Sequence, residues 1–231
     1  MNKRVLRSPF FVVNPKLYLY GQKALELALV ADRLAEQYDV DILFTVQHAD
    51  CYLISQHTKH LILTAQHMDN FSPGRGMGHV LPESLVEAGI QAVFLNHAEH
   101  ALKVNELVKT MQRADELSLI TIVCADSFSE AKAIATLNPD VMVCEPTELI
   151  GTGQSSDISY MQKTNQIVKE MNPSVKVLQA AGISTVADVI KALQSGADGT
   201  GGTSGIVCAD NPIETLKEML EAVYQFKEEQ K

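Results

Sequence analysis

Cysteine is scarce in this chain of 231 residues, which has only four. Cys51, Cys124, Cys144 and Cys208 are widely spaced and form no C-x-x-C pair, so neither a disulfide framework nor a zinc site is indicated. This use of cysteine fits a reducing cytoplasm.

Long apolar runs are also missing. No uninterrupted apolar stretch reaches the roughly 18 residues that would suggest a membrane span. The first residues, MNKRVLRSPFFVVNPK, hold a short apolar run that ends in Asn-Pro-Lys, unlike a secretory signal. We therefore expect a soluble, cytoplasmic protein.

Positive charge is in deficit, since the formal net charge is −9 and the pI is near 5.2. Wholesale nucleic-acid binding or attachment to an anionic membrane surface needs a basic face, so we expect neither partner. An anionic ligand has to be held by local groups.

What the sequence does have is a regular alternation of short apolar runs with longer helical patterns, on a chain that is 46% hydrophobic. Amphipathic helices are predicted for Ala24–Gln37 and for Asn211–Lys227, the second opening on Asn-Pro. The eight predicted strands are Phe10–Val13, Asp41–Val46, Leu61–Ala65, Ala92–Leu95, Leu119–Cys124, Val141–Cys144, Val175–Gln179 and Gly196–Gly199.

No linker, low-complexity tract or charge block divides the chain, apart from a polar tail at Lys227–Lys231. Eight β-α units on one chain predict an α/β fold, a single (β/α)8 TIM barrel over residues 1–231, in preference to an open doubly wound sheet. In such barrels the loops that follow the strands build the active site, and here polar residues follow most of the predicted strands.

Glu145 directly follows the apolar run Val141–Cys144, which places it at the mouth of the barrel. A partly desolvated carboxylate there is suited to removing a proton from carbon, whereas a solvated loop glutamate is the plainer interpretation. The stretch PTELIGTG comes next, with a proline at its entry, an apolar tip and two glycines at its exit. It suits a lid that closes over a ligand, although an ordinary tight loop has the same pattern.

His97 follows Asn96 and precedes a predicted helix from Ala98 to Leu117. A helix N-terminus disfavours a charged imidazolium, so a neutral His97 is a candidate hydrogen-bond donor to a substrate carbonyl. A capping or surface histidine is the alternative. Glu99 is a candidate to orient a neighbour, and helix capping explains it equally well.

Lys16 and Asn14 follow the first predicted strand, where a fixed ammonium could neutralise a phosphate or a developing enolate oxygen. A solvated lysine and a strand-ending asparagine are the plainer alternatives. The segments AAGIS and GTGGTSG offer backbone N–H groups for a phosphate, yet neither matches a P-loop, and simple turns remain possible.

In order along the chain, the motifs VNPKLY, TAQH, GHVLPE, LNHAEH, CEPTELIGTG, AAGIS and GGTSG resemble the triosephosphate isomerase family, especially its compact archaeal-type branch. The resemblance runs from about Asn14 to Ser204. It implies that Glu145 is the catalytic base, His97 the electrophile, and Lys16 and Asn14 substrate contacts, with Glu99 in support. The residues that the resemblance places in the closing loop and in the phosphate-binding turns are Ile150, Gly151, Gly182, Ser184, Gly202, Thr203 and Ser204.

The resemblance further implies aldose-ketose isomerisation of a phosphorylated sugar with no metal or organic cofactor, and a homodimer or homotetramer. In the family the loop corresponding to Met68–Val80 docks into a neighbouring subunit. The sequence departs from the family at Ala98, where serine is common, and at Met77, where threonine is frequent. Pro15 and Thr147 are also unusual.

Three functions follow as hypotheses. The first is interconversion of dihydroxyacetone phosphate and glyceraldehyde 3-phosphate, in glycolysis and gluconeogenesis. The second is the same proton transfer on a larger phosphorylated sugar. The third is a catalytically silent, phosphate-binding barrel, for which the departures at Ala98 and Met77 are the motive.

Overall fold

Eight parallel strands close into a barrel in the computed structural model, which describes residues 3–145 and 155–230. Each strand pairs with the preceding one, and β1 pairs with β8 to complete the ring. The strands are β1 (Phe10–Val13), β2 (Ile42–Val46), β3 (Ile62–Ala65), β4 (Ala92–Leu95), β5 (Ile120–Ala125), β6 (Val141–Cys144), β7 (Lys176–Gln179) and β8 (Gly199–Gly202). The predicted TIM barrel is confirmed.

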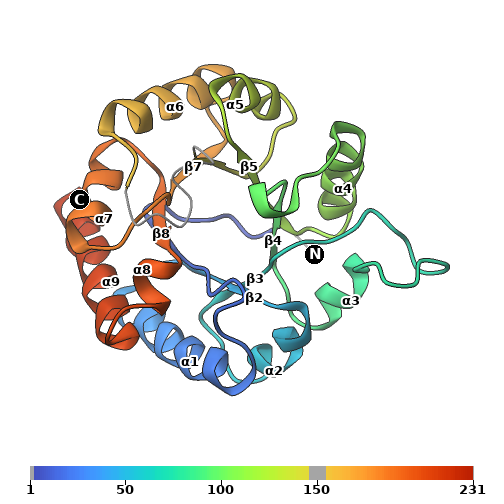
Figure 1. Cartoon of the computed structure of the whole chain (residues 1–231), viewed down its shortest axis with the longest axis horizontal. Coiled ribbons are helices and arrows are strands. Elements are labelled where there is room, and N and C mark those ends of the chain that lie inside the picture. Colours follow the sequence, from blue (N-terminus) through green and yellow to red (C-terminus); the bar gives the residue numbers. More distant parts are fainter. Residues whose placement is uncertain (1–2, 146–154, 231) are drawn as a thin grey trace.

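Helices surround the barrel on its outside (Figure 1). They are α1 (Gly21–Tyr38), α2 (Cys51–Ser55), α3 (Pro82–Glu87), α4 (Val104–Glu116), α5 (Phe128–Ala135), α6 (Ile158–Met171), α7 (Val186–Gln194), α8 (Ser204–Val207) and α9 (Pro212–Glu229), with 3-10 turns η1 (His48–Asp50) and η2 (Ala98–His100). None of the helices in the described residues is long and apolar enough to cross a membrane.

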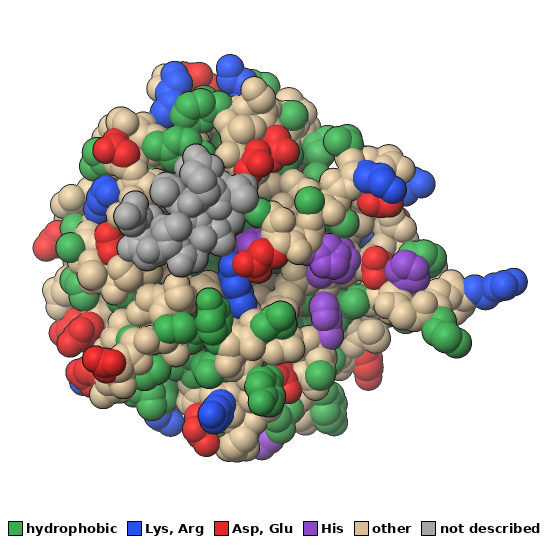
Figure 2. All heavy atoms as spheres, viewed as in Figure 1, with side chains coloured by type: hydrophobic (Ala, Val, Ile, Leu, Met, Phe, Trp, Pro, Cys, Tyr) green, Lys and Arg blue, Asp and Glu red, His purple; other side chains and the backbone are tan. Residues whose placement is uncertain are grey.

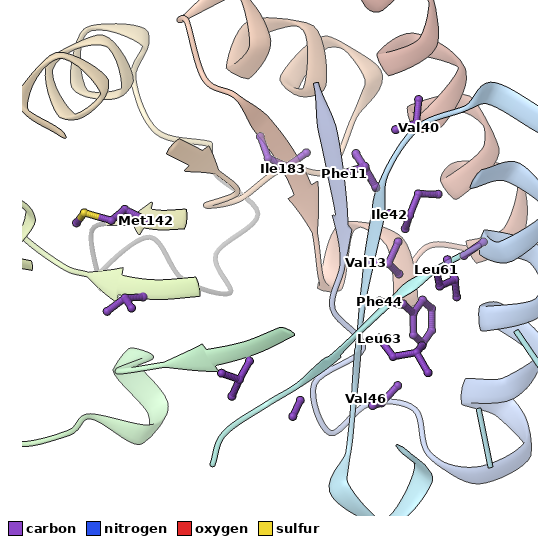
Figure 3. Close-up of a cluster of buried hydrophobic side chains, with 14 of the residues drawn as sticks. Phe11, Val13, Val40, Ile42, Phe44, Val46, Leu61, Leu63, Met142 and Ile183 are labelled. Atoms are coloured by element: carbon purple, nitrogen blue, oxygen red, sulfur yellow. The ribbon is translucent and has the colours of Figure 1, made fainter. Parts of the chain in front are cut away.

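The hydrophobic core has two layers because successive strand residues face opposite sides. Phe10 and Val12 belong to a cluster that fills the inside of the barrel, while Phe11 and Val13 belong to a larger one between the strands and the helices. Figure 3 shows the larger cluster, with Phe44 and neighbouring side chains on the helix side of the strands. All five of these residues are almost completely buried, so both layers stabilise the barrel on which the loops rest.

Seven of the predicted strands agree with the structure to within one residue at each end, but the eighth was wrong. The prediction was Gly196–Gly199, whereas β8 spans Gly199–Gly202. Contact with β1 explains the glycines of this strand. A Cβ atom at Gly201 would lie 2.2 Å from the Val12 carbonyl oxygen. The strand therefore lacks the side-chain pattern by which a strand is recognised in sequence.

The predicted helix from Ala98 to Leu117 was also wrong, because two elements occupy it. The turn η2 ends at His100, and α4 begins at Val104 after an extended segment. The Leu102 N–H donates to the side-chain oxygen of Asn96 at 3.0 Å, which takes the place of a helical hydrogen bond. The predicted helices Ala24–Gln37 and Asn211–Lys227 correspond to α1 and α9.

Candidate active site

The C-terminal ends of the strands surround a cavity of about 120 Å³ at the mouth of the barrel. The described residues lining it are Val12, Asn14, Lys16, Tyr18, Phe94, His97, Glu99, Cys124, Val143, Glu145, Leu178, Ala180, Ala181, Gly182, Ile183, Gly202, Thr203 and Ser204. Most of the site residues expected from sequence are therefore brought together, although they come from segments far apart along the chain.

Lys16 is held rigidly just after β1. Its backbone is left-handed, with φ of 44°, which is uncommon for a residue with a side chain. Its N–H donates to the Asn14 side-chain oxygen at 3.0 Å, and its carbonyl accepts from the Gln66 amide at 2.8 Å. Asn14 in turn donates its own N–H to the Gly202 carbonyl, which ties this turn to β8. These bonds hold the lysine in its strained conformation.

The Lys16 ammonium donates to the Glu99 carboxylate at 2.9 Å, across the mouth of the cavity. Burial opposes ionisation of Glu99, but the hydrogen bond and charge of Lys16 outweigh it and lower the pKa of that carboxyl. Glu99 is thus an anion, and its carboxylate holds the Lys16 ammonium over the cavity.

His97 follows β4 and begins the short turn η2, where its Nδ1 atom accepts a hydrogen bond from the Glu99 N–H at 3.1 Å. Burial, and then the charge of Lys16, lower the pKa of this imidazole below its usual value, with Glu99 acting in the opposite direction. The ring is therefore neutral at neutral pH. Since Nδ1 is the acceptor, the proton lies on Nε2, which is left to donate to a ligand.

Sequence reasoning expected His97 to be neutral because a long helix would begin there. The structure gives a different cause, because η2 has only three residues. The desolvation of the ring and the nearby ammonium account for its lowered pKa.

Glu145 directly follows β6 and is half-buried. Its N–H donates to the Ala125 carbonyl at 3.0 Å, so β5 fixes its backbone. Burial raises the pKa of the Glu145 carboxyl to about 7, and the effect of Glu99 in the same direction is opposed by Lys16. A carboxyl group with this pKa is present in both its protonated and its ionised form at neutral pH, which suits general acid–base catalysis.

Two glycine-containing turns, after β7 and β8, line the cavity on the side of the barrel away from β4. Gly182 has φ of 65°, which glycine adopts without strain, and lies in the turn after β7. A Cβ atom at Gly205 would lie 2.3 Å from the Ile183 carbonyl oxygen, so glycine lets the turn after β8 pack directly on the turn after β7. Gly202, Thr203 and the neighbouring Ser204 line the cavity from this second turn.

Ser184, unlike Ser204, does not line the cavity and is hydrogen-bonded to another side chain. It follows the lining residue Ile183, and both its N–H and its hydroxyl donate to the Asp188 carboxylate, at 3.2 and 3.3 Å. Ile150 and Gly151, which were expected in a closing loop, lie outside the described residues.

Several lining residues were not expected from the sequence. Tyr18, Phe94, Cys124 and Ile183 border the cavity without having been singled out. Phe94 and Cys124 belong to apolar strand runs, and only the knowledge of which strand face points inward could have identified them. Gln66 is one of the polar residues that follow the predicted strands and was given no role, whereas its amide donates to the Lys16 carbonyl.

Ala98 borders a smaller cavity of about 70 Å³, which also adjoins His97 and Glu145. The residue that departs from the family pattern therefore lines the same cavity as both proposed proton-transfer groups.

A wider cavity of about 590 Å³ opens beside the first and shares with it the lining residues Asn14, Lys16, Phe94, His97 and Glu99. Four other histidines border it, namely His48, His67, His79 and His100. Figure 2 shows histidines gathered between the barrel mouth and a projecting segment. The rings of His67 and His100 stack with centroids 4.1 Å apart, and desolvation by burial, followed by the His100 charge, lowers the pKa of His67.

In the part of the chain that the structure describes, no group of three or more His, Cys, Asp or Glu side chains is arranged to hold a metal ion. The residues of the site supply acid-base chemistry themselves. A carboxyl with a pKa of about 7, a neutral imidazole donor and an ammonium together suit the removal of a proton next to a carbonyl and the stabilisation of the resulting oxyanion.

Comparison with known proteins shows the family of the chain. The sequence model of the family "Triosephosphate isomerase" matches residues 9–221. A protein of that name from Methanobacterium bryantii is 36% identical over 224 residues, which make up 95% of this chain and 99% of that protein.

Two further relatives carry the same name. One, from Methanocaldococcus jannaschii, is 35% identical over 92% of this chain and 99% of its own length. Another, from Sulfolobus acidocaldarius, is 31% identical over 93% of this chain and 95% of its own length.

Proposed function

This chain belongs to the triosephosphate isomerase family and interconverts dihydroxyacetone phosphate and glyceraldehyde 3-phosphate, and we propose that Glu145 and His97 carry out the proton transfer. The reaction belongs to glycolysis and gluconeogenesis. One observation supports these roles above all. Glu145, His97 and Lys16 line the same cavity, although they follow three different strands.

In the proposed mechanism the Glu145 carboxylate removes a proton from the carbon that bears the hydroxyl group. The Nε2–H group of His97 donates to the neighbouring carbonyl oxygen, where negative charge develops as the enediolate forms. His97 gives its Nε2 proton to the former carbonyl oxygen and takes the proton of the substrate hydroxyl group in exchange, while the protonated Glu145 returns the other proton to the adjacent carbon. A carboxyl whose pKa is about 7 is suited to both halves of this cycle, since it has to act first as base and then as acid.

Lys16 and Asn14 bind the substrate in this proposal, and the Lys16 ammonium stabilises the negative charge. Glu99 supports them, because its carboxylate accepts from the Lys16 ammonium and its backbone N–H donates to the His97 imidazole. We place the phosphate group at Gly182, Gly202, Thr203 and Ser204, with Ser184 beside them.

Packing of the turns after β7 and β8 supports this phosphate site, because their backbones approach closely at Gly205. On the family resemblance, we also propose Ile150 and Gly151, which lie outside the described residues, as substrate contacts. The binding energy of the phosphate would then help to hold the reacting carbons in place.

The experiment that tests these roles is a coupled assay with glyceraldehyde 3-phosphate on the purified protein, together with Glu145→Gln and His97→Gln. We expect turnover by the parent and a loss of about 10²- to 10⁴-fold in each variant. Variants with the parent's activity would overturn the roles of these residues. An inactive parent would point instead to a larger sugar phosphate or to a silent barrel.

We also propose a homodimer or homotetramer in which residues 69–79 of one copy cover the wider cavity of another. This segment projects from the barrel between β3 and α3 (Figure 1). Its base is ordered by the Asp69 N–H, which donates to the Val80 carbonyl at 3.0 Å, and by the stacked rings of Phe71 and His79, yet Met77 within it is fully exposed. Single exposed apolar side chains are common on protein surfaces, so the projection of the segment and the family resemblance carry this proposal.

Light scattering tests the assembly. We expect the parent to be a dimer or tetramer at micromolar concentration and Met77→Asp to shift it towards the monomer. Lys109→Asp, on α4, serves as a surface control. A monomeric parent would refute the proposal.

For localisation we propose the cytoplasm. All four cysteines are free thiols in the structure, and three of them are buried. Fractionation of source cells with an antibody to the chain tests the assignment, which recovery of the protein outside the cytoplasm would contradict.

A further inference from the structure

Asn96, the residue before His97, has a left-handed backbone with φ of 58° and a side chain bonded at both ends. Its amide donates to the Cys124 carbonyl on β5 at 3.0 Å, and its side-chain oxygen accepts from the Leu102 N–H at 3.0 Å. The second bond encloses residues 97–101, the segment that carries His97 and Glu99. One carboxamide therefore closes this segment and attaches it to the neighbouring strand.

The attachment point is also where Glu145 is fixed. The Glu145 N–H donates to the Ala125 carbonyl, the residue after Cys124 on β5. The end of β5 thus accepts one hydrogen bond from the His97 segment and one from Glu145. The Asn96 side chain and the Glu145 backbone amide, almost fifty residues apart in the sequence, therefore bind to adjacent residues of one strand.

We infer that Asn96 is a positioning residue, which sets His97 relative to Glu145 through the common anchor on β5. This inference rests on the proposed function of those two residues and adds a third residue to it. Asn96 itself acts through His97, because the side chain is engaged with Cys124 and Leu102 at its two ends.

Without the carboxamide, the Leu102 N–H and the Cys124 carbonyl lose their partner, and the 97–101 segment is held by β4 and its own turn. The imidazole then samples positions that do not match the reacting carbonyl oxygen. Proton transfer is sensitive to displacements of about 1 Å, which can cost on the order of a hundredfold in rate. Substrate binding by the phosphate turns on the other side of the cavity is unaffected.

The test is Asn96→Gly, because glycine keeps the left-handed backbone and removes only the carboxamide. Asn138 provides a matched control. It too is left-handed, with φ of 60°, and it too accepts a side-chain hydrogen bond, from Asn172 at 2.7 Å, but it lies before β6 at the other end of the barrel. Asn138→Gly therefore shares the backbone effects without touching the site.

We expect Asn96→Gly to lower kcat by about ten- to a hundredfold with KM within about twofold of the parent. Asn138→Gly should keep both constants within about twofold of the parent. If Asn96→Gly keeps the parent's kcat, or loses it only through a raised KM, the inference is wrong.

A second measurement does not depend on activity. Imidazole ¹⁵N spectra report the tautomer of His97, whose signals are identified by their loss in His97→Gln. We expect the parent to show a neutral ring protonated at Nε2, and Asn96→Gly to show signals averaged between tautomers. An unchanged His97 spectrum in Asn96→Gly would refute the inference.

The two measurements separate this inference from the proposed function. An inactive parent would overturn the proposed function alone, and the spectra would still decide whether Asn96 positions His97. If Asn96→Gly does not fold, Asn96→Asp replaces it, since it keeps the acceptor for Leu102 and loses the donor to Cys124. The same criteria then apply.

Discussion

The Lys16 ammonium and the Glu99 carboxylate form a 2.9 Å ion pair at the mouth of the barrel, and both charges act on Glu145. Lys16 lowers the pKa of Glu145 and Glu99 raises it, while burial raises it most and sets it at about 7. The ion pair is thus a means of adjusting the base without touching it.

A pH profile tests this relationship. Since Glu145 acts first as a base, kcat/KM should fall as the pH decreases through about 7. Glu99→Gln removes a charge that raises this pKa, so its profile should move to lower pH, and Lys16→Gln should move it to higher pH in addition to raising KM. Glu99 is largely exposed, so added salt should reduce its effect.

The control for charge is Glu87→Gln, which removes one exposed carboxylate from α3 and should leave the profile in place. If Glu99→Gln and Lys16→Gln shifted the pH profile of kcat/KM in the same direction, the electrostatic explanation would be wrong.

The contribution of Glu145 to the free energy of unfolding should decrease as the pH rises. A carboxyl whose pKa is higher in the folded than in the unfolded chain contributes stability below its ordinary pKa of 4.5, and this is lost as the pH rises through about 7. Glu145→Gln resembles the protonated form at every pH. We expect the free energy of unfolding of this variant to be about 2 kcal/mol higher than that of the parent near pH 9. Near pH 4 the two proteins should differ little.

Urea denaturation at both pH values measures this difference. An equal effect of the substitution at the two pH values would show that burial of the charge is not its cause.

Asp41, at the opposite end of the barrel, should matter for stability alone. Its carboxylate is almost completely buried and accepts from the Arg7 guanidinium at 2.8 Å and from the Arg7 N–H at 2.9 Å. Burial opposes ionisation, but these bonds and the charge of Arg4 outweigh it and lower the pKa of Asp41. The stability it contributes is therefore present above its ordinary pKa of 3.8 and is lost as the pH falls.

We expect Asp41→Asn to lower the free energy of unfolding by about 2 kcal/mol at neutral pH and to leave kcat unchanged. Asp39→Asn is the matched control, because Asp39 pairs with the same Arg7 at 2.6 Å but is largely exposed. An exposed pair contributes little, so this variant should resemble the parent. Equal losses in the two variants would show that burial is not decisive.

Gly201 should be almost impossible to replace. A Cβ atom there would lie 2.2 Å from a backbone oxygen of β1, so Gly201→Ala has to move one of the two strands that close the barrel. We expect a loss of about 3 kcal/mol or more. Gly76→Ala is the control, since its Cβ would lie 3.4 Å from the ring of Phe71, an ordinary contact.

Thermal denaturation of both glycine variants gives the comparison. We also expect a single cooperative transition for the parent, as predicted for one domain over residues 1–231. Two separate transitions would contradict that prediction.

The strands and the positions of Lys16, His97 and Glu145 could be predicted because apolar runs mark strands and the residues after them mark the mouth of a barrel. The register of β8 could not. Its glycines are required by the distance to Val12, a contact between the two ends of the chain that no local pattern encodes.

The ion pair of Lys16 with Glu99 was equally out of reach, because 83 positions separate the two residues. Capping was a plausible role for Glu99 only as long as a helix was expected to begin there. Asn96 was noted merely as polar, since its left-handed backbone and both of its partners become apparent only in three dimensions.

Pairing of β1 with β8 has a consequence for synthesis of the protein. The ribosome makes Asn14 and Lys16 long before the turn at Gly202–Ser204, and the Asn14 N–H donates to the Gly202 carbonyl. A nascent chain that stops before β8 lacks both this partner and one wall of the cavity. Catalysis therefore begins only after β8 has been made, and a chain that stops earlier is unable to act on the metabolite pool.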